Sequence, residues 1–346
     1  MPVNPAAEIG LGLAALGRPA YINAGRPADL GGHRSIDDLR RRTEEVLDAG
    51  YRMGVRYLDV ARSYGRAEEF LAGWLAARPD VDDVLIGSKW GYRYVGDWRM
   101  DAPVHEVKDH SLAAFTEQYP LTRRWLGDRL GIYHVHSATL DTGVLADPAV
   151  HRALAELRDR GIRVGISTSG PAQADAVRTA LRVRVGGSPL FSSFEVTWNV
   201  LEPSAGPALA EAASSGALVI VKEAVANGRL APAGPAPGGL GPGGPAPGGP
   251  APGGPAPGGP DDTPGARRAA ELAAELSIPV DQLAIAAALA QPWAWRVLSG
   301  AVSVGQLTSN VAAARVALPA GLLDELATLA EPPADYWAAR SRRPWV

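Results

Sequence analysis

Eight short runs rich in aliphatic and β-branched residues alternate with longer helical patterns along this chain of 346 residues. The strand-like runs lie at 8–13, 55–60, 84–88, 132–136, 162–167, 191–197, 217–222 and 295–299. The helical patterns lie at 35–49, 66–77, 107–118, 147–160, 171–181, 204–215, 264–290 (broken at Pro279), 303–315 and 319–330. Eight alternations of this kind predict an α/β protein, a (β/α)8 or TIM barrel in a single domain that spans 1–346.

An open doubly wound sheet also alternates strands and helices, so it is the structural alternative. The first strand-to-helix turn lacks the G-x-G-x-x-G pattern that is typical of dinucleotide-binding sheets. Local signals mark several helix ends. Ser35 and the pair Thr263-Pro264 suit helix starts, and Gly50 and Gly161 suit left-handed helix ends.

Composition narrows the class of protein. The net charge of −3 predicts no basic surface for nucleic acid or membrane, and the absence of cysteine excludes disulfides and thiolate sites. We see no signal peptide and no apolar run of about 18–20 residues, so we expect a cytoplasmic protein. Residues 231–260 repeat proline and glycine, which predicts a solvated tether in the loop after the seventh strand, with no assigned function.

Polar residues gather where the expected strands end, which is where barrel enzymes place their chemistry. These residues are Asp59, Tyr64, Lys89, His136, Ser167, Thr168, Glu195, Lys222 and Glu223. A lysine ammonium near a tyrosine stabilises the phenolate and lowers its pKa, and a buried lysine needs a counter-charge such as Asp59. His136 can orient a substrate oxygen. This set predicts proton transfer to or from an oxygen.

The segments LDVARSYG, IGSKW, IYHVH, GISTS and EVTWN resemble the aldo-keto reductases over roughly residues 8–330. The resemblance implies a barrel that transfers hydride between a nicotinamide cofactor and a carbonyl or alcohol. It implies a catalytic tetrad of Asp59, Tyr64, Lys89 and His136, with Tyr64 as the proton donor. The substrate identity, the physiological direction and the oligomeric state stay open.

The resemblance also implies a cofactor site, although several residues depart from the family pattern. Ser167, Thr168 and Glu195 stand where members hold the nicotinamide carboxamide. Lys222 stands where many members place an aromatic residue, and we expect it to pair with Glu223 or Glu195.

The segment after the eighth strand, 299–310, contains no lysine or arginine. Gly300, Ala301, Val302, Gln306 and Asn310 stand where NADP-preferring members carry their phosphate site. NADPH remains the expected cofactor and NADH the alternative, since a bidentate cation usually selects the extra phosphate. Arg229 is a candidate source of that charge from the loop after the seventh strand.

Aromatic residues suggest the substrate pocket. Trp90, Tyr92, Tyr94 and Trp98 form an aromatic loop after the third strand. The tail 331–346, which contains Tyr336, Trp337 and Trp345, is expected near the same face. Ordinary surface packing explains such aromatics equally well. We expect a small-molecule carbonyl or alcohol as the substrate, without choosing among sugars, ketones and larger compounds.

Other functions stay open. His134 and His136 form an H-x-H pair at a strand end, which suits a metal-dependent hydrolase, although no metal site is expected. A non-catalytic nicotinamide-binding or auxiliary protein of the same fold is another possibility. Within the enzyme class, an NAD-dependent aldose or alcohol dehydrogenase is the alternative to a reductase.

Overall fold

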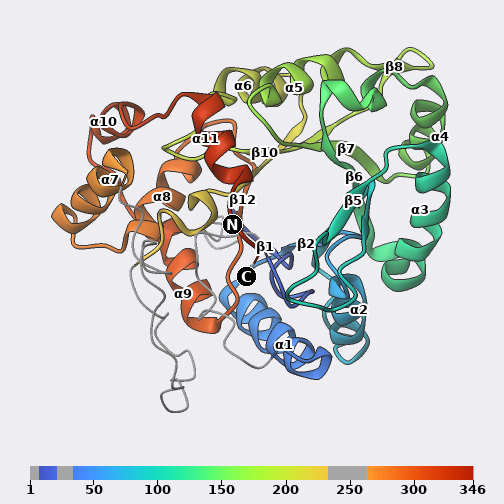
Figure 1. Ribbon diagram of the computed structural model, residues 1–346, viewed down its shortest axis with the longest axis horizontal. Helices are drawn as coiled ribbons and strands as arrows, with labels where there is room; N and C mark the ends of the chain where they lie inside the picture. The colour runs from blue at the N-terminus through green and yellow to red at the C-terminus, as the bar shows by residue number, and fades with distance from the viewer. Residues whose placement is uncertain (1–7, 22–33, 233–262, 346) are drawn as a thin grey trace.

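The computed structural model describes residues 8–21, 34–232 and 263–345. Eight parallel strands close into a barrel in the order β1-β12-β11-β10-β7-β6-β3-β2 (Figure 1). All eight expected strands are present, and the closed ring excludes the open doubly wound sheet. The strands are β1 (Ile9–Gly12), β2 (Tyr57–Asp59), β3 (Leu85–Trp90), β6 (Leu130–Ala138), β7 (Arg163–Thr168), β10 (Ser193–Thr197), β11 (Leu218–Lys222) and β12 (Arg296–Ser299).

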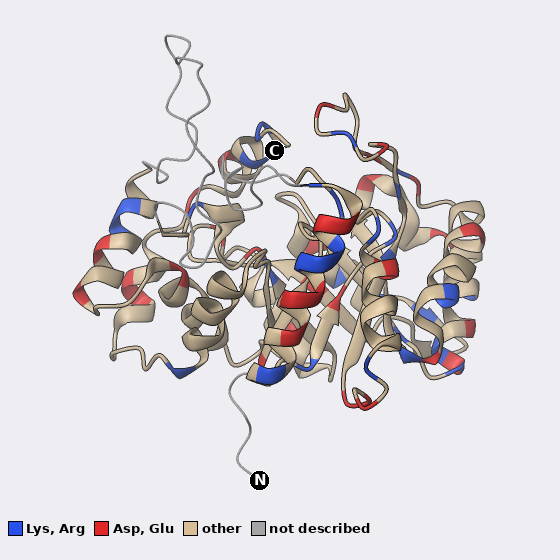
Figure 2. Cartoon of the chain, turned by 90° about the horizontal axis from the view of Figure 1, so that it is seen from below, with Lys and Arg blue, Asp and Glu red and all other residues tan. Residues whose placement is uncertain are grey.

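Helices surround the ring of strands (Figure 1), and the apolar faces of most of them pack against its outer surface. They are α1 (Ile36–Met53), α2 (Ala67–Ala76), α3 (Leu112–Leu126), α4 (Pro148–Asp159), α5 (Gln173–Arg182), α6 (Gly206–Ser214), α7 (Pro264–Glu275), α8 (Val280–Leu289), α9 (Val304–Ala312), α10 (Leu322–Ala327) and α11 (Pro333–Ser341). Figure 2 shows acidic and basic residues interspersed along these outer helices.

The ends of the helices follow the local sequence in part. Ser35 caps α1, because its hydroxyl accepts a hydrogen bond from the Asp38 amide. The expected end at Gly50 is wrong: α1 continues to Gly54, which has a φ of 100°. Gly50 is buried within α1, where an added Cβ would lie 3.3 Å from Leu307 of α9. Its small size therefore serves helix packing.

Three other helix signals have mixed outcomes. Gly161 follows α4 with a φ of 89°, as expected. Pro279 separates α7 from α8 as predicted. Thr263 makes no capping hydrogen bond to α7, because its hydroxyl accepts one from Arg229 at 2.9 Å instead.

Several elements were not expected. β4 (Tyr92–Tyr94) and β5 (Glu106–Lys108) form an antiparallel pair beyond the third barrel strand, so the helix expected from residue 107 begins at Leu112. β8 (Arg184–Val185) and β9 (Ser188–Pro189) form a second short pair. In the tail, α11 packs Tyr336 and Trp337 against α7, α8 and α10.

Nearly all of the proline- and glycine-rich segment 231–260 lies outside the described residues. Among the helices that are described, none alone has the length and apolar character to cross a membrane. Only α7 and α8 taken together, bent by 94°, pass that test.

Candidate active site

A cavity of about 610 Å³ opens at the carboxyl ends of the barrel strands. The last residues of four strands line it: Gly12, Asp59, Lys222 and Ser299. Part of its wall lies across the seam where β1 pairs with β12, in the register Leu11 to Ser299. The barrel therefore brings the polar strand ends to one place, as the sequence predicts.

Lys89 organises the buried side of the cavity. Its side chain is inaccessible to solvent, and Nζ donates hydrogen bonds to Asp59 Oδ1 and, at 3.3 Å, to the Tyr64 hydroxyl. A second carboxylate, Glu195 Oε2, lies 3.2 Å from Nζ. β2, β3 and β10 supply Asp59, Lys89 and Glu195, so the barrel positions one cation between two anions.

Tyr64 stays protonated in this environment. Burial raises the pKa of its hydroxyl well above the usual value, Lys89 lowers it, and the charges of Asp59 and Glu195 raise it again. The expectation that Lys89 lowers this pKa is correct for the lysine alone, but burial and the carboxylates outweigh it. A protonated hydroxyl beside an ammonium can donate a proton to a ligand oxygen.

His136 is held next to Tyr64. The two rings meet edge to face with centroids 5.4 Å apart, and His136 Nδ1 lies 3.4 Å from the Ser63 hydroxyl. The His136 carbonyl lies 2.8 Å from His110 Nε2, which fixes the backbone at the end of β6. Burial, followed by the charge of Lys89, holds the pKa of His136 well below its usual value. The imidazole is therefore neutral and suited to hydrogen bonding.

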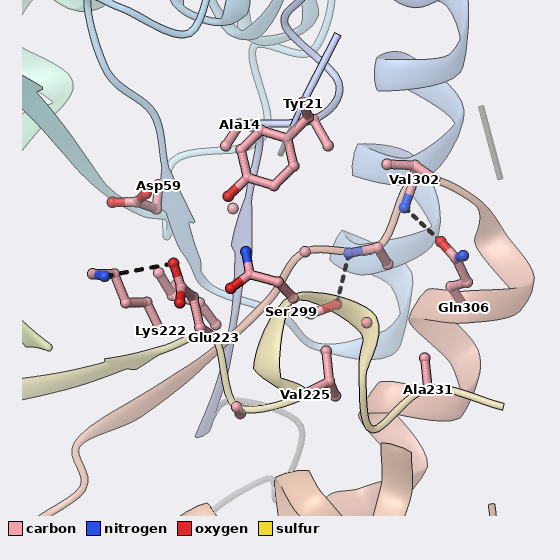
Figure 3. A pocket seen from close by; sticks show the side chains of 18 of the residues that line it. Ala14, Tyr21, Asp59, Lys222, Glu223, Val225, Ala231, Ser299, Val302 and Gln306 are labelled. Atoms are coloured by element: carbon pink, nitrogen blue, oxygen red, sulfur yellow. Dashed lines mark hydrogen bonds and ion pairs between the residues drawn. The ribbon is translucent and has the colours of Figure 1, made fainter. Parts of the chain in front are cut away.

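The exit of β11 carries a second group of charges (Figure 3). Lys222 Nζ donates to Thr197 Oγ1 at 2.6 Å and lies 3.8 Å from Glu223 Oε1, so the expected pairing with Glu223 is confirmed. Glu223 has a φ of 57°, and Arg340 of α11 binds both of its carboxylate oxygens. Burial raises the pKa of Glu223, but Arg340 and Lys222 outweigh it and lower the pKa to about 2.

Ser167 and Thr168 are fully buried at the end of β7 and do not line the cavity. Ser167 Oγ accepts a hydrogen bond from the Ser137 amide at 2.7 Å. The next residue, Ser169, lines the cavity instead. Of the residues expected near a carboxamide, Glu195 is the one that reaches this space.

The segment after β12 lines the other end of the cavity with Gly300, Ala301, Val302, Gln306 and Asn310 (Figure 3). An added Cβ at Gly300 would meet no atom within 4 Å, so the backbone there is open to a ligand. Gln306 Oε1 accepts from the Val302 amide at 2.8 Å.

A buried carboxylate lies near that end. Asp281 of α8 lines the cavity, and the Asn310 amide, oriented to satisfy its neighbours, donates to Asp281 Oδ2 at 3.0 Å. Within the described part of the chain, the segment 299–310 brings no cation to this wall.

Arg229 does not supply the missing charge. Its guanidinium binds both carboxylate oxygens of Glu331, donates to Thr263 and lies over the Tyr336 ring. The side chain is buried and is not part of the cavity wall. The proposal that Arg229 attracts a phosphate is therefore wrong, because its charge serves the packing of α7 and α11.

The aromatic loop contributes less to the cavity than expected. Tyr92 lines it, whereas Trp90 is buried against Phe115 and Trp98 packs on Phe70. Trp345 of the tail lines the cavity, which agrees with the expected position of the tail. Nothing in the sequence pointed to four other lining residues: Arg18, Tyr21, Glu106 and Arg340.

These residues form one contact network across loops. Arg18 donates to Glu106 at 2.7 Å and lies 5.2 Å from the Tyr64 ring and 4.7 Å from the Trp345 ring. Trp345 also stacks on His105 with centroids 4.6 Å apart. The tail thus reaches the same face of the barrel.

The H-x-H pair does not converge on one point. His134 Nε2 lies 2.9 Å from Ser193 Oγ and Nδ1 lies 3.7 Å from Glu195, whereas His136 faces Ser63 and Tyr64. Among the residues that the structure describes, no group of three or more potential ligands could hold a metal ion.

Comparison with known proteins shows which family and which solved structures the chain is similar to. The model of the aldo/keto reductase family matches residues 8–331. The aldo-keto reductase AKR11C1 from Bacillus halodurans, in a holo form, has a TM-score of 0.63 and 23% identity, covering 94% of this chain and 92% of that one. The glycerol dehydrogenase AKR11B4 from Gluconobacter oxydans has a TM-score of 0.62 and 19% identity, covering 93% and 90%. None of the curated proteins compared with the sequence matches it.

Proposed function

Because the chain belongs to the aldo/keto reductase family, we propose that it transfers hydride between a nicotinamide cofactor and an aldehyde or ketone, or the corresponding alcohol. The observation that carries the proposal is the contact of Lys89 with both Asp59 and Tyr64, beside His136, at the wall of a single cavity. Tyr64 is the proposed proton donor.

In this mechanism the substrate carbonyl oxygen lies between the Tyr64 hydroxyl and the His136 imidazole. His136 orients the oxygen, and Tyr64 gives it a proton as negative charge develops there. Lys89, held by Asp59, stabilises the phenolate that remains. The cofactor supplies the hydride when bound, and alcohol oxidation runs the same proton transfer in reverse.

The cofactor's residues are proposed from the cavity wall. Glu195 and Ser169 lie near the tetrad and would face the nicotinamide end, and Lys222 lies at the exit of β11. Gly300, Ala301, Gln306 and Asn310 are proposed for the phosphate and adenosine end (the chemistry of backbone amides and neutral side chains fits both).

Sequence analysis favoured NADPH, but the described residues favour NADH. Arg229 is engaged elsewhere, and among the described residues the segment 299–310 on this wall brings no cation that could select a 2′-phosphate. NADPH becomes the alternative.

A small polar alcohol or its carbonyl form is the proposed substrate, in a proposed cytoplasmic setting. The charged pair Arg18–Glu106 and the rings of Tyr92 and Trp345 line the space beside Tyr64, which suits hydroxyl groups on a compact carbon skeleton. The similarity to a protein described as a glycerol dehydrogenase is consistent with this choice. An NAD-dependent alcohol or aldose dehydrogenase is thus the second candidate.

The test is Tyr64→Phe, which removes a hydroxyl and little else. We expect turnover of carbonyl or alcohol substrates to fall at least on the order of 10²-fold. Binding of NADH and NADPH, followed by quenching of tryptophan fluorescence, should change little. Retained turnover would show that Tyr64 is not the acid. If the wild-type protein bound neither cofactor, the hydride-transfer proposal itself would fail. Cofactor binding without turnover of any carbonyl or alcohol would favour the non-catalytic role instead.

A further inference from the structure

Glu195 is a buried carboxylate that the proton transfer does not use. It lies in β10, is 2% exposed, and lines the cavity. Its Oε2 accepts no hydrogen bond within the described part of the chain, although Lys89 Nζ lies 3.2 Å away. A neutral amide would fill the same space without the energetic cost of burying a charge.

The charges around Lys89 do not balance. Lys89 contacts two carboxylates, Asp59 and Glu195, and His134 beside Glu195 is a neutral imidazole, since burial holds its pKa at about 4. Lys89 donates a hydrogen bond to Asp59 but none to Glu195 Oε2, which lies 3.2 Å from Nζ. Asp59 is thus the carboxylate that pairs with the ammonium, and Glu195 carries the carboxylate charge in excess.

The other cation near Glu195 is already engaged. Lys222 donates to Thr197 and pairs with Glu223, which Arg340 also binds. Lys222 therefore forms no ion pair with Glu195, whose carboxylate lines the cavity next to the Lys89–Tyr64 contact.

A hydride donor that works with Tyr64 must reach the same carbonyl group as the Tyr64 hydroxyl. Reacting atoms approach to about 3–3.5 Å, so the donor ring lies within a few ångströms of this hydroxyl. Lys89 Nζ lies 3.3 Å from the Tyr64 hydroxyl and 3.2 Å from Glu195 Oε2. A single ammonium group therefore separates the Glu195 carboxylate from the Tyr64 hydroxyl. Its charge acts on any ring that reacts there.

We propose that Glu195 makes this site select the oxidised form of the nicotinamide, whose ring is positively charged, over the reduced form, whose ring is neutral. This inference rests on the proposed function. It makes Glu195 a residue that sets the direction of the reaction, toward alcohol oxidation, rather than one that only hydrogen-bonds the carboxamide. A hydrogen bond to the carboxamide alone would contribute equally to the affinity for the oxidised and the reduced form.

The experiment compares wild type, Glu195→Gln and Glu202→Gln. The control residue follows the same strand, is also buried, and lies outside the cavity wall. Dissociation constants for NAD⁺ and NADH, or for the NADP pair if wild type prefers it, are measured by quenching of tryptophan fluorescence. Circular dichroism checks that each variant is folded.

We expect Glu195→Gln to raise the ratio of the oxidised to the reduced dissociation constant on the order of tenfold, from the interaction of unit charges a few ångströms apart. The reduced form should bind nearly as before, and Glu202→Gln should leave the ratio unchanged. Equal weakening of both forms, or no change, would overturn the inference while leaving the proposed function intact. A wild type that binds no nicotinamide would refute the proposed function instead.

Discussion

His134 should make the barrel lose stability as the pH falls from 8 to 5. Its side chain is fully buried, with Nε2 2.9 Å from Ser193 Oγ, and burial lowers its pKa from 6.5 to about 4. Between these two values the unfolded chain binds a proton at His134 and the folded chain does not. The contribution of His134 to the free energy of unfolding is therefore fully present above about pH 6.5 and is lost as the pH falls toward 4.

The magnitude follows from the two pKa values. At pH 5 the unfolded imidazole is almost wholly protonated, whereas the folded one is mostly neutral. The free energy of unfolding then falls by about 2 kcal/mol relative to pH 8 on account of His134 alone. Other groups titrate over the same range, so the prediction concerns a difference between two proteins.

The assay is urea unfolding of wild type and His134→Gln at pH 8 and pH 5. Glutamine keeps a polar group near Ser193 but cannot take up a proton. The variant should be less stable than wild type at pH 8, yet it should lose about 2 kcal/mol less than wild type on acidification. The reasoning is refuted if both proteins lose the same amount.

Two further substitutions test contacts that shape the cavity. Arg340→Ala leaves the buried Glu223 without its bidentate partner and should cost about 3 kcal/mol in urea unfolding, whereas Arg268→Ala, which breaks only exposed pairs, should change the free energy of unfolding little; equal costs would contradict the role of burial. Gly17→Ala places a Cβ 2.2 Å from the Tyr64 carbonyl oxygen and should lower both stability, by about 1–3 kcal/mol, and turnover, because Tyr64 must move. Gly73→Ala, where the Cβ meets nothing within 4 Å, is the control and should be neutral or slightly stabilising in thermal unfolding.

The barrel could be predicted because its evidence is local and repeated. Each strand is a short apolar run, and each is followed by a helical period, so errors at single boundaries do not change the topology. The β4–β5 pair escaped this reasoning, since Tyr92–Tyr94 and Glu106–Lys108 pair across a loop and neither segment has a strand pattern of its own. Gly50 also carried the right local signal for a helix end, but its contact with α9 depends on tertiary packing.

The convergence of Asp59, Tyr64, Lys89 and His136 could be predicted for a related reason: these residues stand at or just after strand ends, which the barrel brings together. Most of the substrate side could not, because Arg18 and Glu106 come from loops whose positions no periodicity indicates. Arg229 is the opposite case, a residue that was expected to reach the cofactor and does not. A cation in the right loop looked available, yet Glu331, far along the chain, already neutralises it.

The seam between β1 and β12 connects the cavity to the closure of the barrel. These strands come from opposite ends of the sequence, and the ring closes only where Ile9, Gly10 and Leu11 pair with Val297, Leu298 and Ser299. Gly12 lies on one side of that seam and Ser299 and Gly300 lie on the other, and all three face the cavity. A molecule bound across them would contact both edges of the ring at once. Binding at this site would therefore also stabilise the pairing of β1 with β12 that closes the barrel.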